Sequence, residues 1–133
     1  MTSERYRCSA GAVYSLKYHI VFCPKYRRPV LVGDIADDAA ALIREKARAL
    51  GATVHALEVM PGHVHLCAES DPTLPVHFLV NQFKGYTSRV LRNRYPALKS
   101  RLPALWSRAY YCGTVGHVSD QTVRRYIDAQ KGV

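Results

Sequence analysis

The spacing of apolar residues changes several times along this chain, and the order of the changes restricts the folds that it can form. From Ala12 to Cys23 apolar side chains occupy alternate positions, which predicts a half-buried strand. From Ile35 to Leu50 they recur every third or fourth residue, which predicts an amphipathic helix. The later segments predict, in order, strands over 52–60 and 63–69, a helix over 76–94, a strand over 105–115 and a last helix within 119–131.

The resulting order, β-α-β-β-α-β with an additional C-terminal helix, indicates the α+β class. We expect a ferredoxin-like or RRM-like antiparallel sheet with the two central helices on one face. Asp34 is the expected N-cap of the first helix, Gly51 its expected end, and Pro61-Gly62 the turn between two strands. With 133 residues the chain fits a single domain over 1–133, with a loose arm over 1–11 and an irregular basic segment over 96–103.

Positive charge is concentrated in two tracts that contain no acidic residue. The net charge is +9, and the tracts extend over 5–33 and 72–119. Aromatic residues lie among these cations, and a surface of this kind binds phosphates and stacks on unpaired bases. We therefore expect single-stranded nucleic acid as the partner; the alternative is an ordinary solvated surface. The expected contact residues are Lys17, His19, Lys25, Arg27, Arg28, Lys84, Tyr86, Arg89, Arg92, Arg94, Trp106 and Tyr110.

Cysteine usage and the absence of long apolar runs bear on the compartment. The four cysteines lie far apart without a Cys-x-x-Cys pair, which indicates reduced thiols in a cytoplasmic protein. No apolar run reaches the roughly 18–20 residues that a membrane-spanning helix needs. The polar N-terminus is not followed by the apolar core of a signal peptide. We expect no association with a membrane.

A His-x-His motif, His63-Val64-His65, follows the Pro61-Gly62 turn. Because side chains alternate along a strand, both imidazoles should project to one face while Val64 points to the core. Two neutral imidazoles at this spacing can bind one divalent metal ion. Two alternatives stay open. The histidines lie on a solvated strand face, or Cys67 joins them in a zinc site, for which one strand is poorly shaped.

Tyr126 and Gln130 lie one turn apart in the last helix, so their side chains share a face. Neighbouring arginines bring positive charge close to the tyrosine. A phenol has a pKa near 10 and is a poor nucleophile at neutral pH, so a reactive tyrosine needs a cation or metal nearby. A basic helix laid across the His-x-His face meets this requirement. The alternative is a tyrosine packed in the core.

Three motifs resemble those of one family. Residues 59–66 read Val-Met-Pro-Gly-His-Val-His-Leu, residues 18–27 read Tyr-His-Ile-Val-Phe-Cys-Pro-Lys-Tyr-Arg, and residues 125–130 read Arg-Tyr-Ile-Asp-Ala-Gln. In identity and order they resemble the HUH single-tyrosine transposases of small bacterial insertion sequences. The likeness extends from about Tyr14 to Gln130. The family commonly has an acidic residue at the position of Gly62 and often an asparagine at that of Ala129.

The resemblance implies a function and a set of site residues. It implies a DNA transposase in which His63, His65 and Gln130 bind Mg²⁺ or Mn²⁺. Tyr126 would attack single-stranded DNA and form a 5′-phosphotyrosine intermediate. The resemblance also implies recognition of DNA hairpins at the ends of the element and a homodimer, in which the tyrosine helix of one subunit can complete the histidine site of the other. No nucleotide cofactor is expected, because the covalent link conserves the phosphodiester energy and no phosphate-binding glycine loop occurs.

Two other functions are alternatives to this one. A non-catalytic DNA- or RNA-binding module would use the same sheet, but the chain lacks the aromatic-glycine signature of such modules on a central strand. A cyclic-phosphate hydrolase would use His117-Val118-Ser119 as one of two His-x-Ser/Thr motifs, and the chain has no good second motif.

Overall fold

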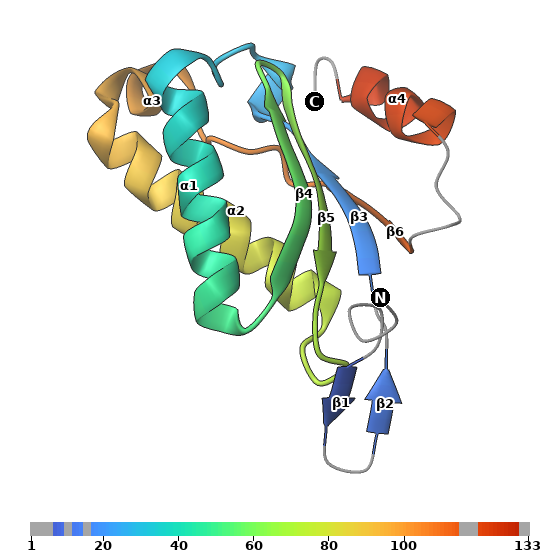
Figure 1. Ribbon diagram of the computed structural model, residues 1–133. Helices are drawn as coiled ribbons and strands as arrows, with labels where there is room; N and C mark the ends of the chain where they lie inside the picture. Colours follow the sequence, from blue (N-terminus) through green and yellow to red (C-terminus); the bar gives the residue numbers. More distant parts are fainter. Residues whose placement is uncertain (1–6, 10–11, 15–16, 115–119, 131–133) are drawn as a thin grey trace.

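The centre of the molecule is a four-stranded antiparallel sheet with the strand order β4-β5-β3-β6 (Figure 1). Its strands are β3 (Lys17–Phe22), β4 (Thr53–Met60), β5 (His63–Glu69) and β6 (Tyr111–Thr114). The computed structural model describes residues 7–9, 12–14, 17–114 and 120–130. β3 and β5 lie side by side in the middle, helices connect β3 to β4 and β5 to β6, and a tight turn joins β4 to β5, so the topology is that of the ferredoxin-like fold.

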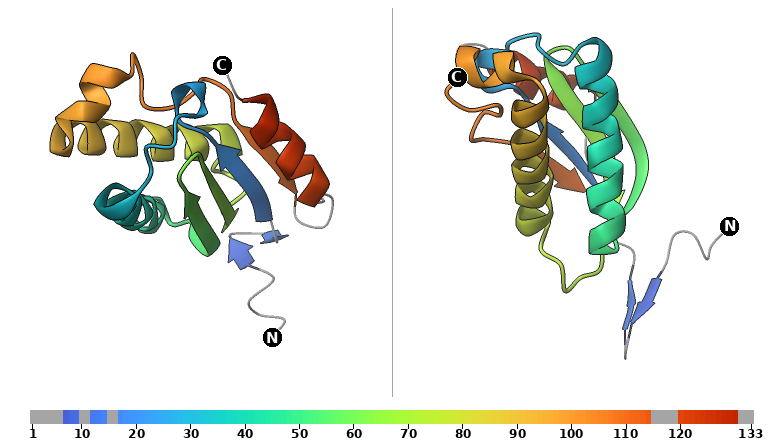
Figure 2. Two further views of the ribbon diagram at one scale, coloured as in Figure 1. Left: turned by 90° about the horizontal axis from the view of Figure 1, so that it is seen from above. Right: turned by 90° about the vertical axis from the view of Figure 1, so that its left-hand side faces the viewer.

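Two long helices cover one face of this sheet, and a shorter helix lies on the other. α1 (Gly33–Leu50) and α2 (Val76–Arg94) pack together on the first face, and α3 (Pro96–Arg101) follows α2. α4 (Asp120–Ala129) contacts β3 from the opposite face, as Figures 1 and 2 show. The predicted α+β class, with two helices on one face of an antiparallel sheet and an additional C-terminal helix, is therefore confirmed.

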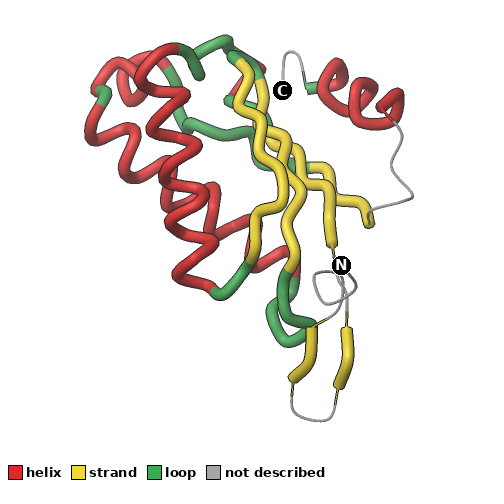
Figure 3. The backbone as a smooth tube through the Cα atoms, viewed as in Figure 1, coloured by secondary structure: helices red, strands yellow, loops and turns green. Residues whose placement is uncertain are grey.

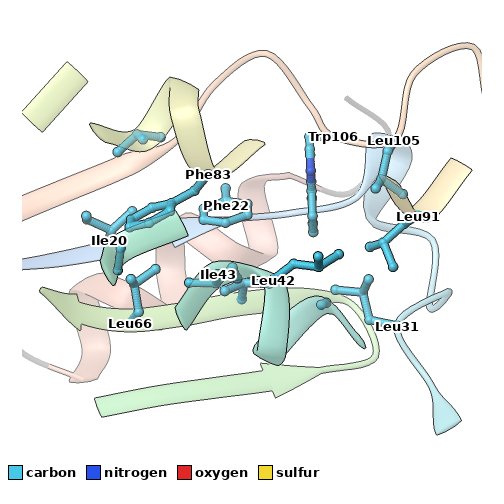
Figure 4. Close-up of a cluster of buried hydrophobic side chains, with 14 of the residues drawn as sticks. Ile20, Phe22, Leu31, Leu42, Ile43, Leu66, Phe83, Leu91, Leu105 and Trp106 are labelled. Atoms are coloured by element: carbon cyan, nitrogen blue, oxygen red, sulfur yellow. The ribbon is translucent and has the colours of Figure 1, made fainter. Parts of the chain in front are cut away.

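The core lies between the sheet and the layer formed by α1 and α2 (Figure 4). Alternate side chains of β3 and β5 enter it, with Ile20 and Phe22 from one strand and Val64 and Leu66 from the other. Phe83 of α2 meets them from the helix side and is fully buried. Burial of apolar surface stabilises a fold by about 25 cal/mol per Å², so this face is the main source of stability.

Trp106 belongs to the same core, which corrects its predicted role in base stacking. Its ring meets that of Phe22 edge-on, with 4.7 Å between the centroids, and its Nε1–H donates to Thr87 Oγ1 at 2.9 Å. Only 6% of the residue is exposed. The indole therefore has no open face for a nucleic-acid base, because both its ring and its N–H have partners inside the protein.

The ends of the long helices agree with the residues expected to stop or start them, with one correction. Gly51 ends α1 in the left-handed conformation with φ of 75°, as predicted. Asp34 does not cap α1: the N-cap is Val32, without a side-chain hydrogen bond, and Asp34 lies in the first turn. Its negative charge there still interacts favourably with the helix dipole. Both bounds of α2 are those predicted.

Two tyrosine–carboxylate hydrogen bonds join α1 to the middle and to the C-terminal end of α2. Tyr95 OH donates to Asp38 Oδ2 at 2.6 Å, and Tyr86 OH donates to Glu45 Oε1 at 2.9 Å. The bond to Asp38 raises the pKa of Tyr95 to about 12.

Within the described ranges, no helix combines the length and the apolarity that a membrane crossing requires.

Three segments differ from the expected secondary structure (Figure 3). The N-terminal segment contains a separate two-stranded sheet of β1 (Arg7–Ser9) and β2 (Ala12–Tyr14), so the strand expected over 12–23 is divided. The segment expected to be irregular contains α3, since proline is favourable in the first helical turn. The strand expected over 105–115 is restricted to β6. Leu105 and Trp106 are both buried although consecutive, which strand alternation does not allow on a sheet with one covered face.

Candidate active site

The sheet face opposite α1 and α2 carries the histidines. On β5, His63, His65 and Cys67 alternate with the core residues and therefore project to this face. On β3, His19 and Val21 do the same. The strand register places Val21 directly opposite His65 and His19 opposite Cys67. We call this surface the histidine face.

His65 contacts a third histidine, which the sequence placed among the DNA contacts. Nδ1 of His19 and Nε2 of His65 lie 3.1 Å apart, and the ring centroids are 5.3 Å apart. One imidazole must donate its N–H and the other must accept it, so at least one of the two rings is neutral. A hydrogen bond at one nitrogen fixes the tautomer and the orientation of the ring, and so prepares the second nitrogen for a ligand.

His63 lies at the start of β5 and is half buried. Burial lowers the pKa of His63, and the Arg27 guanidinium lowers it further. The neutral imidazole therefore persists to a lower pH than in an exposed histidine. The neutral form is the one that binds a metal ion.

The donors on the histidine face are not those of a zinc site. Across residues 7–9, 12–14, 17–114 and 120–130, no group of three His, Cys, Asp or Glu side chains could hold a metal ion. This result contradicts the zinc site that would combine His63, His65 and Cys67. Burial also raises the pKa of the Cys67 thiol, which disfavours the thiolate that zinc requires. A metal ion on this face needs an additional donor of another kind.

α4 brings Tyr126 to the histidine face. Ile127 packs on Val21 in a small apolar cluster, and Tyr126 and Tyr111 adjoin this pair. The ring centroids of the two tyrosines are 5.7 Å apart. Because Val21 projects to the histidine face and is the direct cross-strand neighbour of His65, this packing places α4 over that face. The expected cap of this helix, Ser119, and the His117-Val118-Ser119 motif lie outside the described residues.

Tyr126 and Gln130 both end in buried atoms that have no partner in the described structure. The Tyr126 hydroxyl and Gln130 Oε1 make no hydrogen bond there, and Gln130 is only 6% exposed. Burial, together with the nearby Cys23, raises the pKa of Tyr126, so its phenol is protonated at neutral pH. An unsatisfied buried polar atom costs about 1–3 kcal/mol. Such atoms require an explanation, and a bound ion or a catalytic role is one.

An ion pair connects the end of α4 with the turn that precedes His63. Arg27 Nη1 and Asp128 Oδ1 are 3.5 Å apart. The Arg27 side chain also lies against Gly62, where an added Cβ would be 3.4 Å from its Cγ and Nε atoms. Arg27 therefore lies between the helix of Tyr126 and the β4–β5 turn, at the end of the sheet that α4 approaches in Figure 1. Sequence reasoning missed this contact, because Arg27 and Asp128 are far apart in the chain and neither belongs to a recognisable pair.

Some of the predicted nucleic-acid contacts are engaged within the fold. The Lys84 ammonium donates to the carbonyl oxygens of Ser107 and Arg108, at 2.7 and 3.1 Å. Arg92 donates to the Leu102 carbonyl at 3.3 Å. Both side chains thus support the segment between α2 and β6. Burial also lowers the pKa of Lys84.

Other predicted contacts lie at the surface. Arg28, Arg89 and Arg94 are exposed, and Lys17 and Lys25 are half buried. Tyr86 is flanked by Arg89, with its guanidinium carbon 5.5 Å from the ring centroid, while the hydroxyl of Tyr110 lies 3.2 Å from a ring nitrogen of His77. The structure thus provides cations and rings on α2, away from the histidine face. It does not gather all predicted contacts into one surface.

Comparison with known proteins places this geometry in a family. Residues 12–130 match the family described as Transposase IS200 like. The chain belongs to this family. An IS200-like relative, the ISDra2 transposase TnpA of Deinococcus radiodurans, is 38% identical over 122 residues, which are 90% of this chain and 87% of the relative. The transposase for insertion sequence element IS200 of Salmonella typhimurium is 31% identical over 105 residues, which are 77% of this chain and 69% of the relative.

Solved structures of transposases share the fold of this IS200-like chain. A crystal structure of a Deinococcus radiodurans protein described as a transposase has a TM-score of 0.88 at 33% identity, over 96% of this chain and 99% of that one. A REP-associated tyrosine transposase, solved bound to a REP hairpin, has a TM-score of 0.57 at 13% identity. It covers 85% of this chain and 62% of its own, and at this identity it shows the fold alone. The predicted membership of a family of insertion-sequence transposases is confirmed.

Proposed function

We propose that this transposase cleaves and rejoins single-stranded DNA through a covalent link to Tyr126, with the assistance of a divalent metal ion. The observation that carries the proposal is the pair of buried atoms without protein partners, the Tyr126 hydroxyl on α4 and Oε1 of Gln130, the residue that follows this helix. A tyrosine whose role is only to pack in the core usually has its hydroxyl bonded to another group of the protein. Among the described residues neither atom has a protein partner, as expected of groups that act on a ligand.

His63, His65 and Gln130 are the residues that would hold the metal ion. They offer two imidazole nitrogens and one amide oxygen. The oxygen suits Mg²⁺ and Mn²⁺, and water completes the coordination of either ion. The lowered pKa of His63 favours the neutral form that metal binding requires. When bound, the ion supplies positive charge that favours the phenolate and stabilises the phosphate oxygens in the transition state.

Tyr126 is the nucleophile in this proposal. Its oxygen forms a bond to phosphorus, the bond to the 3′ oxygen breaks, and a 5′-phosphotyrosine and a free 3′-hydroxyl result. The proton that the phenol loses balances the proton that the departing 3′ oxygen gains. In the second step a 3′-hydroxyl of another DNA end attacks the phosphotyrosine, restores the phosphodiester and releases Tyr126. Each step forms one ester bond and breaks one, so no nucleotide cofactor is needed.

The DNA would be held by the exposed cations and rings. Arg28 and Arg89 would contact phosphates, as would Arg94 if it left its ion pair with Asp38. The half-buried rings of Tyr86 and Tyr110 would contact bases through their open edges. The REP-associated relative was solved with a hairpin, and we propose that this chain likewise recognises hairpins, at the ends of its own element. We further propose that it acts in the cytoplasm as a homodimer, which light scattering of the purified protein would test.

The decisive measurement is formation of a covalent adduct. The full chain is incubated with Mn²⁺ or Mg²⁺ and labelled single strands that carry the hairpins flanking its gene, and the products are separated under denaturing conditions. We expect a DNA-linked protein band that disappears with a chelator. Its yield should fall at least about a thousandfold in Tyr126→Phe, because the variant lacks the nucleophilic oxygen.

Tyr111→Phe is the matched control. The ring of Tyr111 lies in the same cluster as that of Tyr126, so the variant removes a hydroxyl nearby without removing the nucleophile. We expect it to retain the adduct. Binding that survives the chelator and Tyr126→Phe, with no adduct on any hairpin strand, would instead indicate a non-catalytic nucleic-acid-binding module.

A further inference from the structure

A cavity of ≈ 390 Å³ opens beside His63, between residues 24–30, here called the basic loop, and the β4–β5 turn. Small-ligand sites have volumes of about 300–1,000 Å³. The proposed transesterification uses only His63 of its lining. The lining combines a cation and an imidazole with apolar side chains: Arg27, Pro29, Met60, Pro61, Gly62 and His63.

The two walls of the cavity are held in place by backbone hydrogen bonds. Lys25 N–H donates to the Leu105 carbonyl at 2.8 Å, and Leu31 N–H donates to the Pro61 carbonyl at 3.1 Å. Between these two points Tyr26 and Arg27 have positive φ values of 59° and 52°. This conformation is strained for a residue other than glycine, and it clusters at ligand sites, where the surrounding structure enforces it. The basic loop is therefore a preformed wall rather than a loose connection.

The remaining features keep the cavity open and partly apolar. A Cβ on Gly62 would already lie 3.4 Å from two atoms of Arg27, so a longer side chain there would fill the cavity or displace the arginine. Met60 is 41% exposed, although it is one of the large apolar side chains of the molecule. A flexible methionine next to proline rings provides an adaptable apolar surface for a flat ligand.

We propose that this cavity binds one unpaired nucleobase of the DNA strand whose phosphate lies at His63. Unpaired bases are bound by stacking on a guanidinium or an aromatic ring and by contact with apolar side chains, which Arg27, Met60 and Pro61 provide. The cations of the basic loop attract the backbone of the same strand. The inference rests on the proposed function. It adds a contact with the base of the nucleotide beside the reacting phosphate, so a nucleotide without a base would lose this contact.

The test separates the base from the phosphates. Binding is measured by fluorescence anisotropy in the Tyr126→Phe protein without metal, so that no chemistry occurs. The probes are a thymidine 12-mer and an abasic 12-mer of equal length and charge. We expect Gly62→Gln, which fills the cavity, and Met60→Ala, which removes an apolar wall, each to weaken binding of the thymidine strand about tenfold. Binding of the abasic strand should change less than about twofold.

Phe78→Ala is the matched control, because Phe78 is an equally exposed apolar side chain on α2, 43% exposed and outside the cavity. It should leave the binding of both strands unchanged. Equal losses for the two strands in the cavity variants would show an effect on phosphate binding or folding, and would overturn the proposal. Unchanged binding of the thymidine strand in both cavity variants would overturn it as well.

A crosslink locates the base directly. A single 5-iodouracil is placed beside the cleaved phosphate, and after irradiation we expect crosslinked peptides from residues 24–30 or 60–63. Crosslinks confined to other peptides would contradict the proposal. Binding is measured in a protein that cannot cleave DNA, so the proposal of a base-binding cavity and the proposal of catalysis by Tyr126 are tested independently. A missing adduct with cavity-dependent base binding removes only the enzymatic mechanism, whereas an adduct with cavity-independent binding removes only the base site.

Discussion

The two faces of the sheet are built from the same strands and differ in the hydrogen bonding of their buried polar atoms. On the face covered by α1 and α2 the buried side chains are almost all apolar, and the indole N–H of Trp106 donates to the hydroxyl of Thr87, although Arg92 Nε on α2 has no partner among the described residues. On the histidine face, the Tyr126 hydroxyl and Gln130 Oε1 are buried without a partner in the described structure. One face therefore stabilises the fold, and the other presents polar atoms whose partners a ligand can supply. The packed core holds the strands in place and so fixes the positions of the side chains on the histidine face.

Two adjacent residues offer the strongest test of this division, because His63 projects to the histidine face and Val64 to the core. We expect His63→Ala to reduce adduct formation at least about a hundredfold, since it removes a proposed metal donor. Its free energy of unfolding should stay close to that of the parent. Val64→Ala should lower that free energy by about 2 kcal/mol, through lost burial and a residual cavity.

Both quantities are measured on the same preparations, by urea denaturation and by quantitative gel analysis of the adduct. Val64→Ala should keep its activity per folded molecule, so it serves as the control for His63→Ala. Undiminished adduct formation in His63→Ala would remove this residue from the site. Loss of the fold in His63→Ala would show that the histidine face also supports stability.

A smaller effect is expected at His19, which touches the proposed metal site only through its 3.1 Å contact with His65. A residue that orients a metal-bound histidine affects metal affinity about 10- to 100-fold when it is removed. We expect His19→Ala to raise the Mn²⁺ concentration for half-maximal adduct formation about tenfold, with the rate at saturating Mn²⁺ preserved. His77→Ala, on α2, is the control and should not shift the Mn²⁺ requirement. A parental Mn²⁺ requirement in His19→Ala would contradict an orienting role.

The last test concerns how stability depends on pH through Cys23, the residue after β3. Burial raises the pKa of the Cys23 thiol from 9.0 to about 11. A group whose pKa is higher in the folded protein favours folding below its unfolded pKa, and this contribution is lost as the pH rises through the folded value. The melting temperature should therefore fall between pH 9.0 and about 11, more steeply in the parent than in Cys23→Ala. Parallel declines would show that the buried thiol does not contribute.

The elements were predictable where local signals decide them. The bounds of α2 were predicted from periodicity and the flanking prolines, and the end of α1 from Gly51. The strand expected from Leu105 onward was wrong because tertiary packing buries consecutive residues there, which overrides alternation. α3 was missed because Pro96 was treated as a boundary, whereas it starts a helix.

The site, too, combines features that the local sequence predicts with features that depend on the tertiary structure. That His63 and His65 share a face follows from alternation along one strand, and the place of His65 opposite Val21 depends on the pairing of β5 with β3, which spacing alone does not give. The contact between His19 and His65 depends on that register too. The position of Arg27 depends on its positive φ, for which no glycine or asparagine gave a signal. The roles of Tyr126 and Gln130 remain predictions that the experiments above address.

The contact of α4 with the sheet has a consequence for how the molecule opens. Among the side chains of α4 that the structure describes, residues 125–129, Ile127 is the buried one and packs on Val21, and the pair of Arg27 with the exposed Asp128 is worth less than about 1 kcal/mol. Segments with few buried contacts detach at free energies well below that of global unfolding. Deuterium should therefore replace the amide protons of α4 while those of β3 and α2 are still protected. On warming, the helix that carries Tyr126 would separate first, so heat inactivation would precede the melting of the sheet.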